Sequence, residues 1–101
     1  MKPVVVAPAA RVEAVEASDY YDQRQPGLGE HFTAAVEACW ARLQPVVQWP
    51  VVEEWEGREI RRAIVRGPFP YHVIFVELEH EVRVLAVMHT ARDPGYWHGR
   101  I

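Results

Sequence analysis

Five side chains in the second half of the sequence have the types needed to bind and protonate a phosphate ester. Arg62 and Arg66 stand at even spacing in a strand-like run, so both would point to one face, where either could hold a phosphate through two hydrogen bonds. His89 is the natural titrating group near neutral pH. Arg92 and Tyr96 would add positive charge and a ring that stacks or donates a proton. These residues form a candidate catalytic set.

The same side chains also have structural interpretations, which the sequence alone leaves open. Arg62 and Arg66 would be solubilising charges on an exposed strand, and His89 would donate to a carbonyl at the strand end. Tyr96 and Trp97 would close the bottom of the core.

Other chemistries have weaker support. The histidines at positions 31, 72, 80, 89 and 98 have no metal-ligand spacing, so we expect no metal. The PGLG run at 26–29 is interpreted as a turn, because a phosphate-binding loop would need a lysine and a preceding strand. Glu53 and Glu54 are interpreted as a solvated pair in a loop. We expect no nucleotide cofactor.

The elements that must position these residues follow from periodicity and from proline and glycine breaks. A β-branched run predicts a first strand over 4–7, and apolar stripes predict helices over about 9–25 and 28–43, joined by a tight turn at Pro26–Gly29. The first stripe is Ala10, Ala14, Ala17 and Tyr21, and the second is Phe32, Val36, Cys39 and Leu43. Residues 45–58 lack a clean period and predict an irregular connection whose tryptophans pack on core edges. Three strands are expected over 59–66, 71–78 and 82–88.

This order predicts an α+β fold of β-α-α-β-β-β type, with a helical hairpin packed on one face of a small antiparallel sheet. In the strand over 71–78, Val73 and Phe75 are expected on one face, with His72, Ile74, Val76 and Leu78 on the other. We expect the second sheet face and the segment 89–101 to be left for function.

Length and composition bound the class of protein. A chain of 101 residues, half hydrophobic and a quarter charged, is long enough for one globular domain over 1–101. Cys39 has no partner for a disulfide, which suits a reducing compartment. No apolar run approaches the ~20 residues that span a bilayer, and no signal peptide is recognisable. We therefore expect a cytoplasmic protein without membrane contact.

Charge is unevenly distributed along the chain, whose net charge is −3. Residues 1–60 carry five basic and ten acidic side chains, whereas residues 61–101 carry six basic, four acidic and four of the five histidines. The basic part could face a polyanion, but the acidic remainder argues against broad nucleic-acid affinity.

The stretch YYDQRQPGLGEHF at 20–32 resembles the helix–turn–helix signature of many RelE/ParE-type toxins of bacterial type II toxin–antitoxin systems. Later residues resemble the sheet and tail of that superfamily, namely Arg61-Arg62, Phe69-Pro70-Tyr71, residues 84–89 (VLAVMH), Arg92, Pro94 and Trp97. The resemblance covers nearly the whole chain in order and spacing. It implies an α+β toxin that arrests growth until a cognate antitoxin wraps around it in a hetero-oligomer.

The target differs between branches of the superfamily. One branch cleaves messenger RNA on the ribosome without metal, by attack of a ribose 2′-hydroxyl on the adjacent phosphate, and the five candidate residues would serve that reaction. However, the only lysine is Lys2, so the lysine-rich strand of the known nucleases is absent. The ParE-type branch binds DNA gyrase and needs no catalytic set. We favour the binding inhibitor, with the endoribonuclease and a non-toxic, partner-binding scaffold as alternatives.

A partner surface is expected on the first helix. Val12 and Val15 lie outside its apolar stripe and are poorly explained as solvent-facing residues. An antitoxin strand or helix would cover them.

Overall fold

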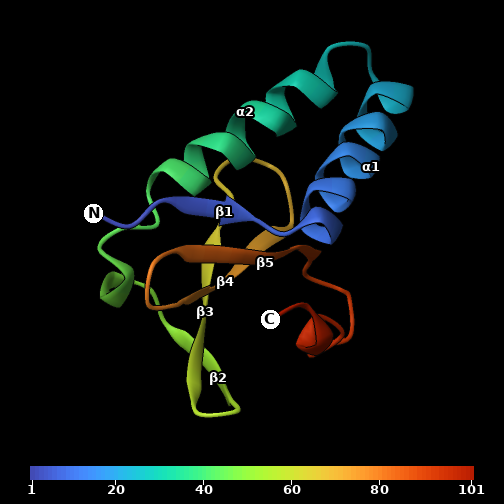
Figure 1. Cartoon of the computed structure of the whole chain (residues 1–101). Helices are drawn as coiled ribbons and strands as arrows, with labels where there is room; N and C mark the ends of the chain where they lie inside the picture. The colour runs from blue at the N-terminus through green and yellow to red at the C-terminus, as the bar shows by residue number, and fades with distance from the viewer.

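The computed structural model describes residues 1–101, which form one helical hairpin and one sheet (Figure 1). The helices are α1 (Pro8–Arg24) and α2 (Leu28–Ala41), with short 3-10 helices η1 (Val46–Gln48) and η2 (His98–Arg100). The strands are β1 (Val4–Val6), β2 (Val51–Trp55), β3 (Arg58–Ile64), β4 (Tyr71–Glu77) and β5 (Val82–His89). None of the helices is long and apolar enough to span a membrane.

The sheet has five strands in the order β1-β5-β4-β3-β2. The pairs β2–β3, β3–β4 and β4–β5 are antiparallel, whereas β1 runs parallel to β5. The α+β class is therefore confirmed, but the expectation of a purely antiparallel sheet is wrong. The sheet is mixed because the helical hairpin carries the chain away from β1, and the hairpin-linked strands then bring β5 back beside it.

Strand β2 lies where the sequence predicted an irregular connection. It forms a hairpin with β3 through Glu56 and Gly57, whose φ angles of 50° and 79° suit a tight two-residue turn. The register shifts between Val51 and Glu53, so Val52 has no partner on β3. This irregularity on an edge strand puts two exposed valines side by side and removes the alternation that would have revealed the strand.

The helices pack on one sheet face, as predicted. Their stripes meet Val73 and Phe75 of β4 in a cluster that also contains Phe69, and the whole core of this face is essentially free of solvent. The helices approach most closely at Gly29, where a Cβ would stand 2.7 Å from the Asp22 carboxylate. The Gly29 N–H donates to Asp22 Oδ1 at 2.8 Å, and Ser18 Oγ donates to the Gly29 carbonyl at 3.1 Å. The turn stretch thus brings the two helices together.

The second sheet face is also covered, which corrects the expectation that it is free. Trp97 is 2% exposed and packs with Ile60, Ile74, Val76, Leu85 and Ala86, and Trp55, Tyr96 and Ile101 surround this cluster. The tail segment, defined here as residues 90–101, forms a third layer below β5 in Figure 1. A β-bulge enlarges the cluster, because Ile74 pairs with Ala86 and Phe75 with Val84, which leaves Leu85 as an extra residue on this face.

Candidate functional site

The tail segment reaches its position by passing around the free edge of β5. Strand β1 pairs only with Val82–Val84, so the rest of that edge needs other partners. Glu13 Oε1 of α1 accepts from the Val87 N–H at 3.1 Å, and Arg100 Nη1 donates to the Leu85 carbonyl at 3.1 Å. Arg100 Nη1 also donates to Glu13 Oε1 at 2.8 Å. The side chains of Glu13 and Arg100 thus form hydrogen bonds with backbone groups of β5 that β1 does not pair.

A groove of about 300 Å³ opens beside this edge, between α1 and the end of β5. It is lined by Glu13, Glu16, Ala17 and Tyr20 of α1, Tyr71 of β4, Val87 and His89 of β5, and Arg92. His89 pairs with Tyr71 across the strands, and their rings meet edge to face with centroids 5.1 Å apart. Two of the five candidate catalytic residues, His89 and Arg92, therefore share one groove.

The hydrogen bond of His89 defines its neutral tautomer. The Ala91 N–H donates to His89 Nδ1 at 3.0 Å, so the proton of the neutral ring belongs on Nε2. This differs from the expectation that His89 donates to a strand-end carbonyl. The ring is exposed, and Nε2 remains available for a ligand.

Tyr96 lies beneath two guanidinium groups. Arg92 stands 4.0 Å and Arg100 4.9 Å from the centroid of its ring. Burial, and then hydrogen bonding to Glu13 and the charge of Glu13, raise the pKa of the Tyr96 phenol despite the opposing charges of the arginines. The phenol is therefore neutral at physiological pH, and Tyr96 serves both as a platform for Arg92 and as part of the second-face cluster.

Arg62 lies on the other side of the sheet from His89. It pairs with Ile74, which belongs to the second-face cluster, and directly paired residues share a face. His72 pairs with Ile64, two positions from Arg62 on the same face, and burial, followed by the charge of Arg62, lowers the pKa of His72. The Arg62 Nε is buried without an acceptor.

Arg66 is not on the strand at all, which corrects the spacing argument that placed it beside Arg62. Strand β3 ends at Ile64, and Arg66 lies in the following loop. Burial raises the pKa of the Cys39 thiol, and the charges of Arg42 and Arg66 oppose that shift. Cys39 Sγ of α2 donates to the Ile64 carbonyl at 3.7 Å, so the loop that carries Arg66 begins beside α2.

The groove beside β5 consequently holds one imidazole and one guanidinium, with the carboxylates of Glu13 and Glu16 next to them. Cleavage of RNA by in-line attack requires positive charge around the phosphorane as well as an acid and a base. Neither Arg62 nor Arg66 lines the groove, and the two carboxylates oppose a phosphate. The arrangement suits hydrogen bonding to a partner better than phosphoryl transfer.

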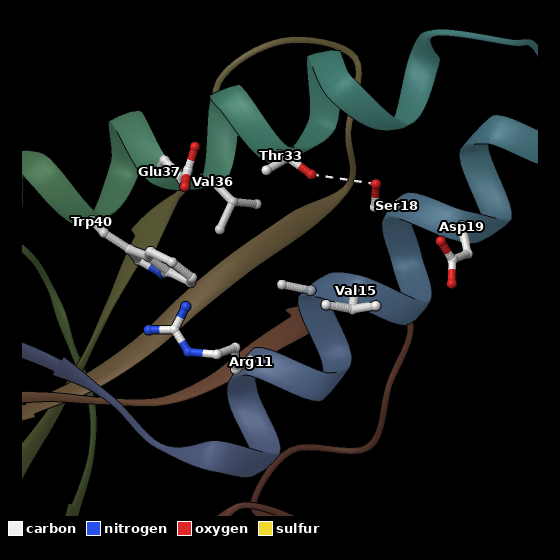
Figure 2. A pocket seen from close by; sticks show the side chains of 9 residues that line it. Arg11, Val15, Ser18, Asp19, Thr33, Val36, Glu37 and Trp40 are labelled. Carbon is white, nitrogen blue, oxygen red and sulfur yellow. Dashed lines mark hydrogen bonds between the residues drawn. The ribbon is translucent and has the colours of Figure 1, made fainter.

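A second hollow lies between the helices, on their outer surface (Figure 2). Val15 lines it and is 57% exposed, and Val12 is 54% exposed and lines an adjoining hollow with Pro8, Arg11 and Glu16. The structure therefore places Val12 and Val15, the two residues predicted to bind a partner, at the surface beside these hollows.

The sequence analysis did not identify the residues that hold the tail segment. Glu53 was interpreted as a solvated loop residue, yet it lies on β2 and its Oε2 is 2.6 Å from His98 Nε2. Glu53 and His98 are 45 positions apart, so no local pattern could pair them.

No group of three or more histidine, cysteine, aspartate or glutamate side chains is gathered closely enough to hold a metal ion. The sequence matches no protein-family model and no curated protein.

Proposed function

We propose that this chain is the growth-inhibiting member of a bacterial toxin–antitoxin pair of the RelE/ParE type. In this proposal it acts by binding an essential protein, such as DNA gyrase, and a cognate antitoxin neutralises it. The resemblance of residues 20–32 and of the later strand and tail motifs is the starting point. The strand–helix–helix–strand order and the packing of the hairpin on the sheet are compatible with it.

The observation that carries the pairing with a partner is the exposed apolar surface of α1. Val12 and Val15 both stay more than half exposed beside hollows, although the helix already packs its own stripe, with Ala10 and Ala17 buried, against the core. Exposed aliphatic side chains next to surface hollows are typical of protein–protein contact sites. An antitoxin segment is the partner that the proposal assigns to them.

The choice of binding over cleavage rests on the dispersal of the cationic candidates. Arg62 shares a sheet face with Ile74, Arg66 lies in the loop after β3, and His89 and Arg92 line the groove beside β5. Neither Arg62 nor Arg66 lines the groove that holds His89. A protein-directed inhibitor needs no such convergence.

The endoribonuclease remains the second candidate because of one observation. His89 and Arg92 share a groove, and Tyr96 lies directly beneath Arg92. These three side chains could supply an acid or base, one positive charge and a stacking ring.

The test is expression of the chain from a tightly repressed bacterial promoter, with and without the neighbouring reading frame. Growth arrest that the neighbouring frame relieves is expected, and unimpaired growth at high expression would remove the toxin proposal. In vitro, the purified protein should stop supercoiling by gyrase and leave ribosome-bound messenger RNA intact. Cleavage of the message, lost in His89→Ala, would replace the gyrase proposal by the nuclease. Growth without arrest, together with binding of the neighbouring gene product, would identify a non-toxic scaffold.

A further inference from the structure

Arg11 and Trp40 face each other across the cleft between α1 and α2 (Figure 2). The guanidinium carbon of Arg11 stands 5.7 Å from the centroid of the Trp40 ring. Arg11 lies in the first turns of α1 and Trp40 in the last turn of α2, so the antiparallel hairpin brings these distant positions together.

Both groups lack an acceptor. The Trp40 Nε1–H is buried and has no hydrogen-bond partner. The Arg11 side chain forms no hydrogen bond and no ion pair with any other residue. A buried donor without a partner is unfavourable, and an unpaired guanidinium beside it provides further donors with the same need. One carboxylate between them would satisfy both.

The protein surface around Arg11 and Trp40 has hollows large enough for a carboxylate and for an apolar chain attached to it. Arg11 borders three adjoining hollows: the interhelical cleft of about 160 Å³, a hollow of about 470 Å³ toward β1, and the one beside Val12, of about 310 Å³. The cleft offers Ala14, Val15 and Val36 as its apolar lining. The hollow toward β1 adds Val4 and Val6, together with Lys2, whose ammonium is already paired with Glu77 and the Leu78 carbonyl.

The charges of the cleft set the orientation of an occupant. Asp19 and Glu37 also line it, but neither forms an ion pair with Arg11. In Figure 2 Asp19 lies further along α1, away from Arg11, so its carboxylate would repel an anion at that end of the cleft, whereas Glu37 lies on α2 between Val36 and Trp40. The negative group of an occupant belongs at the Arg11 end, with apolar atoms over Val15 and Val36. Two carboxylates and an apolar lining disfavour a polyanion such as RNA.

We propose that this cleft binds a carboxylate carried by an acidic and aliphatic segment of a separate protein partner. The carboxylate accepts from the Arg11 guanidinium and from the Trp40 indole N–H, and the neighbouring aliphatic side chain covers Val15. The indole N–H is buried, so in this proposal the exposed Arg11 side chain, which lies over the Trp40 ring, moves with the incoming oxygen. The identification of that partner as the antitoxin rests on the proposed function, whereas the carboxylate site itself does not.

The test uses small probes, so it is independent of the partner's identity. The ¹⁵N-labelled protein is titrated with N-acetyl-leucine, which carries a carboxylate, and with N-acetyl-leucinamide, which does not, while the indole N–H signals are followed by NMR. Loss of one signal in Trp40→Phe identifies the Trp40 resonance. We expect N-acetyl-leucine to shift it and to bind about tenfold more tightly than the amide, because the amide cannot form the charge-assisted hydrogen bonds.

The matched variants are Arg11→Gln and Arg24→Gln. Arg24 lies on the same helix, over the ring of Tyr20 and outside the cleft. We expect Arg11→Gln to remove the preference for the carboxylate and Arg24→Gln to keep it. An unmoved Trp40 signal up to the solubility limit of the probe, or equal shifts with both probes, would overturn the proposal. Self-association of the protein that Arg11→Gln abolishes would also overturn it, because the occupant would then be a second copy.

Failure of this proposal is distinguishable from failure of the proposed function. Growth arrest without probe binding would reject the carboxylate site and leave the toxin proposal intact. Probe binding without growth arrest would keep the site and reject the toxin.

Discussion

The imidazole of His98 stacks on the indole of Trp55, with ring centroids 3.7 Å apart and 10° between the planes. The same imidazole places Nε2 at 2.6 Å from Glu53 Oε2, so the tail segment is joined to β2 by both a ring face and a ring nitrogen. On the opposite side, Arg100 joins it to Glu13 of α1. Trp97 lies between these two attachments and fills the second-face cluster.

Trp97→Ala should therefore lower the free energy of unfolding by about 3–5 kcal/mol, the range for removing a large buried ring. Urea denaturation followed by circular dichroism measures it. Val47→Ala is the matched control, because Val47 is 76% exposed and its truncation should change stability by no more than about 0.5 kcal/mol. Equal stability of the two variants would mean that the tail segment does not pack on the sheet.

Gly29→Ala should destabilise the protein by about 1–3 kcal/mol, although alanine ordinarily favours a helix. The added Cβ would meet the Asp22 carboxylate at 2.7 Å and the Ser18 carbonyl at a closer distance, and it would force the hairpin apart. Gly99→Ala is the control, since no atom lies within 4 Å of a Cβ there. Thermal unfolding of the two variants compares them. A Gly29→Ala protein as stable as the parent would contradict the close approach of α1 and α2.

Titration of His72 by NMR should give a pKa below 6.5, because burial and then the charge of Arg62 lower it. Since the folded-state pKa is depressed, the unfolded chain takes up a proton first as the pH falls through 6.5. The contribution of His72 to the unfolding free energy is therefore present above that pH and is lost below it.

Substitutions of Arg62 and Arg66 provide the test variant and the control variant for the titration of His72. Arg62→Gln should raise the pKa of His72 only in part, because burial is the larger cause, and Arg66→Gln should leave it unchanged. An equal effect of both substitutions would place the two arginines on one face, as the sequence had predicted.

Val12→Glu and Val15→Glu should prevent the neighbouring gene product from relieving growth arrest, because each puts a charge on the surface assigned to the partner. The arrest itself should persist. Val47→Glu is the control, as Val47 is an exposed valine outside the helical hairpin. Colony counts with both genes induced measure the effect. Full relief in both α1 variants would remove this surface as the contact site.

Much of the fold was predictable because it depends on local periodicity. The stripes of Ala10, Ala17, Phe32 and Val36 identified the buried sides of both helices, and they are the sides that the sheet covers. The alternation in 71–78 separated Val73 and Phe75 from Ile74 and Val76 correctly. These patterns are fixed by the periods of helices and strands.

The features that sequence missed depend on contacts between distant positions. Strand β2 lost its alternation at Val52, and the parallel pairing of β1 with β5 joins the two ends of the chain. The sequence left open whether Trp97 closes the core, because the segment that carries it has no period of its own, and the structure confirms that Trp97 packs on the second face. Arg66 was predicted to lie on the strand because the first residue that breaks the strand pattern is Gly67. The strand in fact ends at Ile64, where no residue type indicates an end.

The parallel pairing of β1 with β5 and the docking of residues 95–101 also set an order of events during synthesis. Residues 4–6 leave the ribosome first, but their strand partner at 82–84 follows more than seventy residues later. The helical hairpin can form early from its own turn, whereas both the edge strand and the third layer must wait for the last part of the chain. During that interval the apolar side chains of β3 and β4 are open to chaperones and to misfolding.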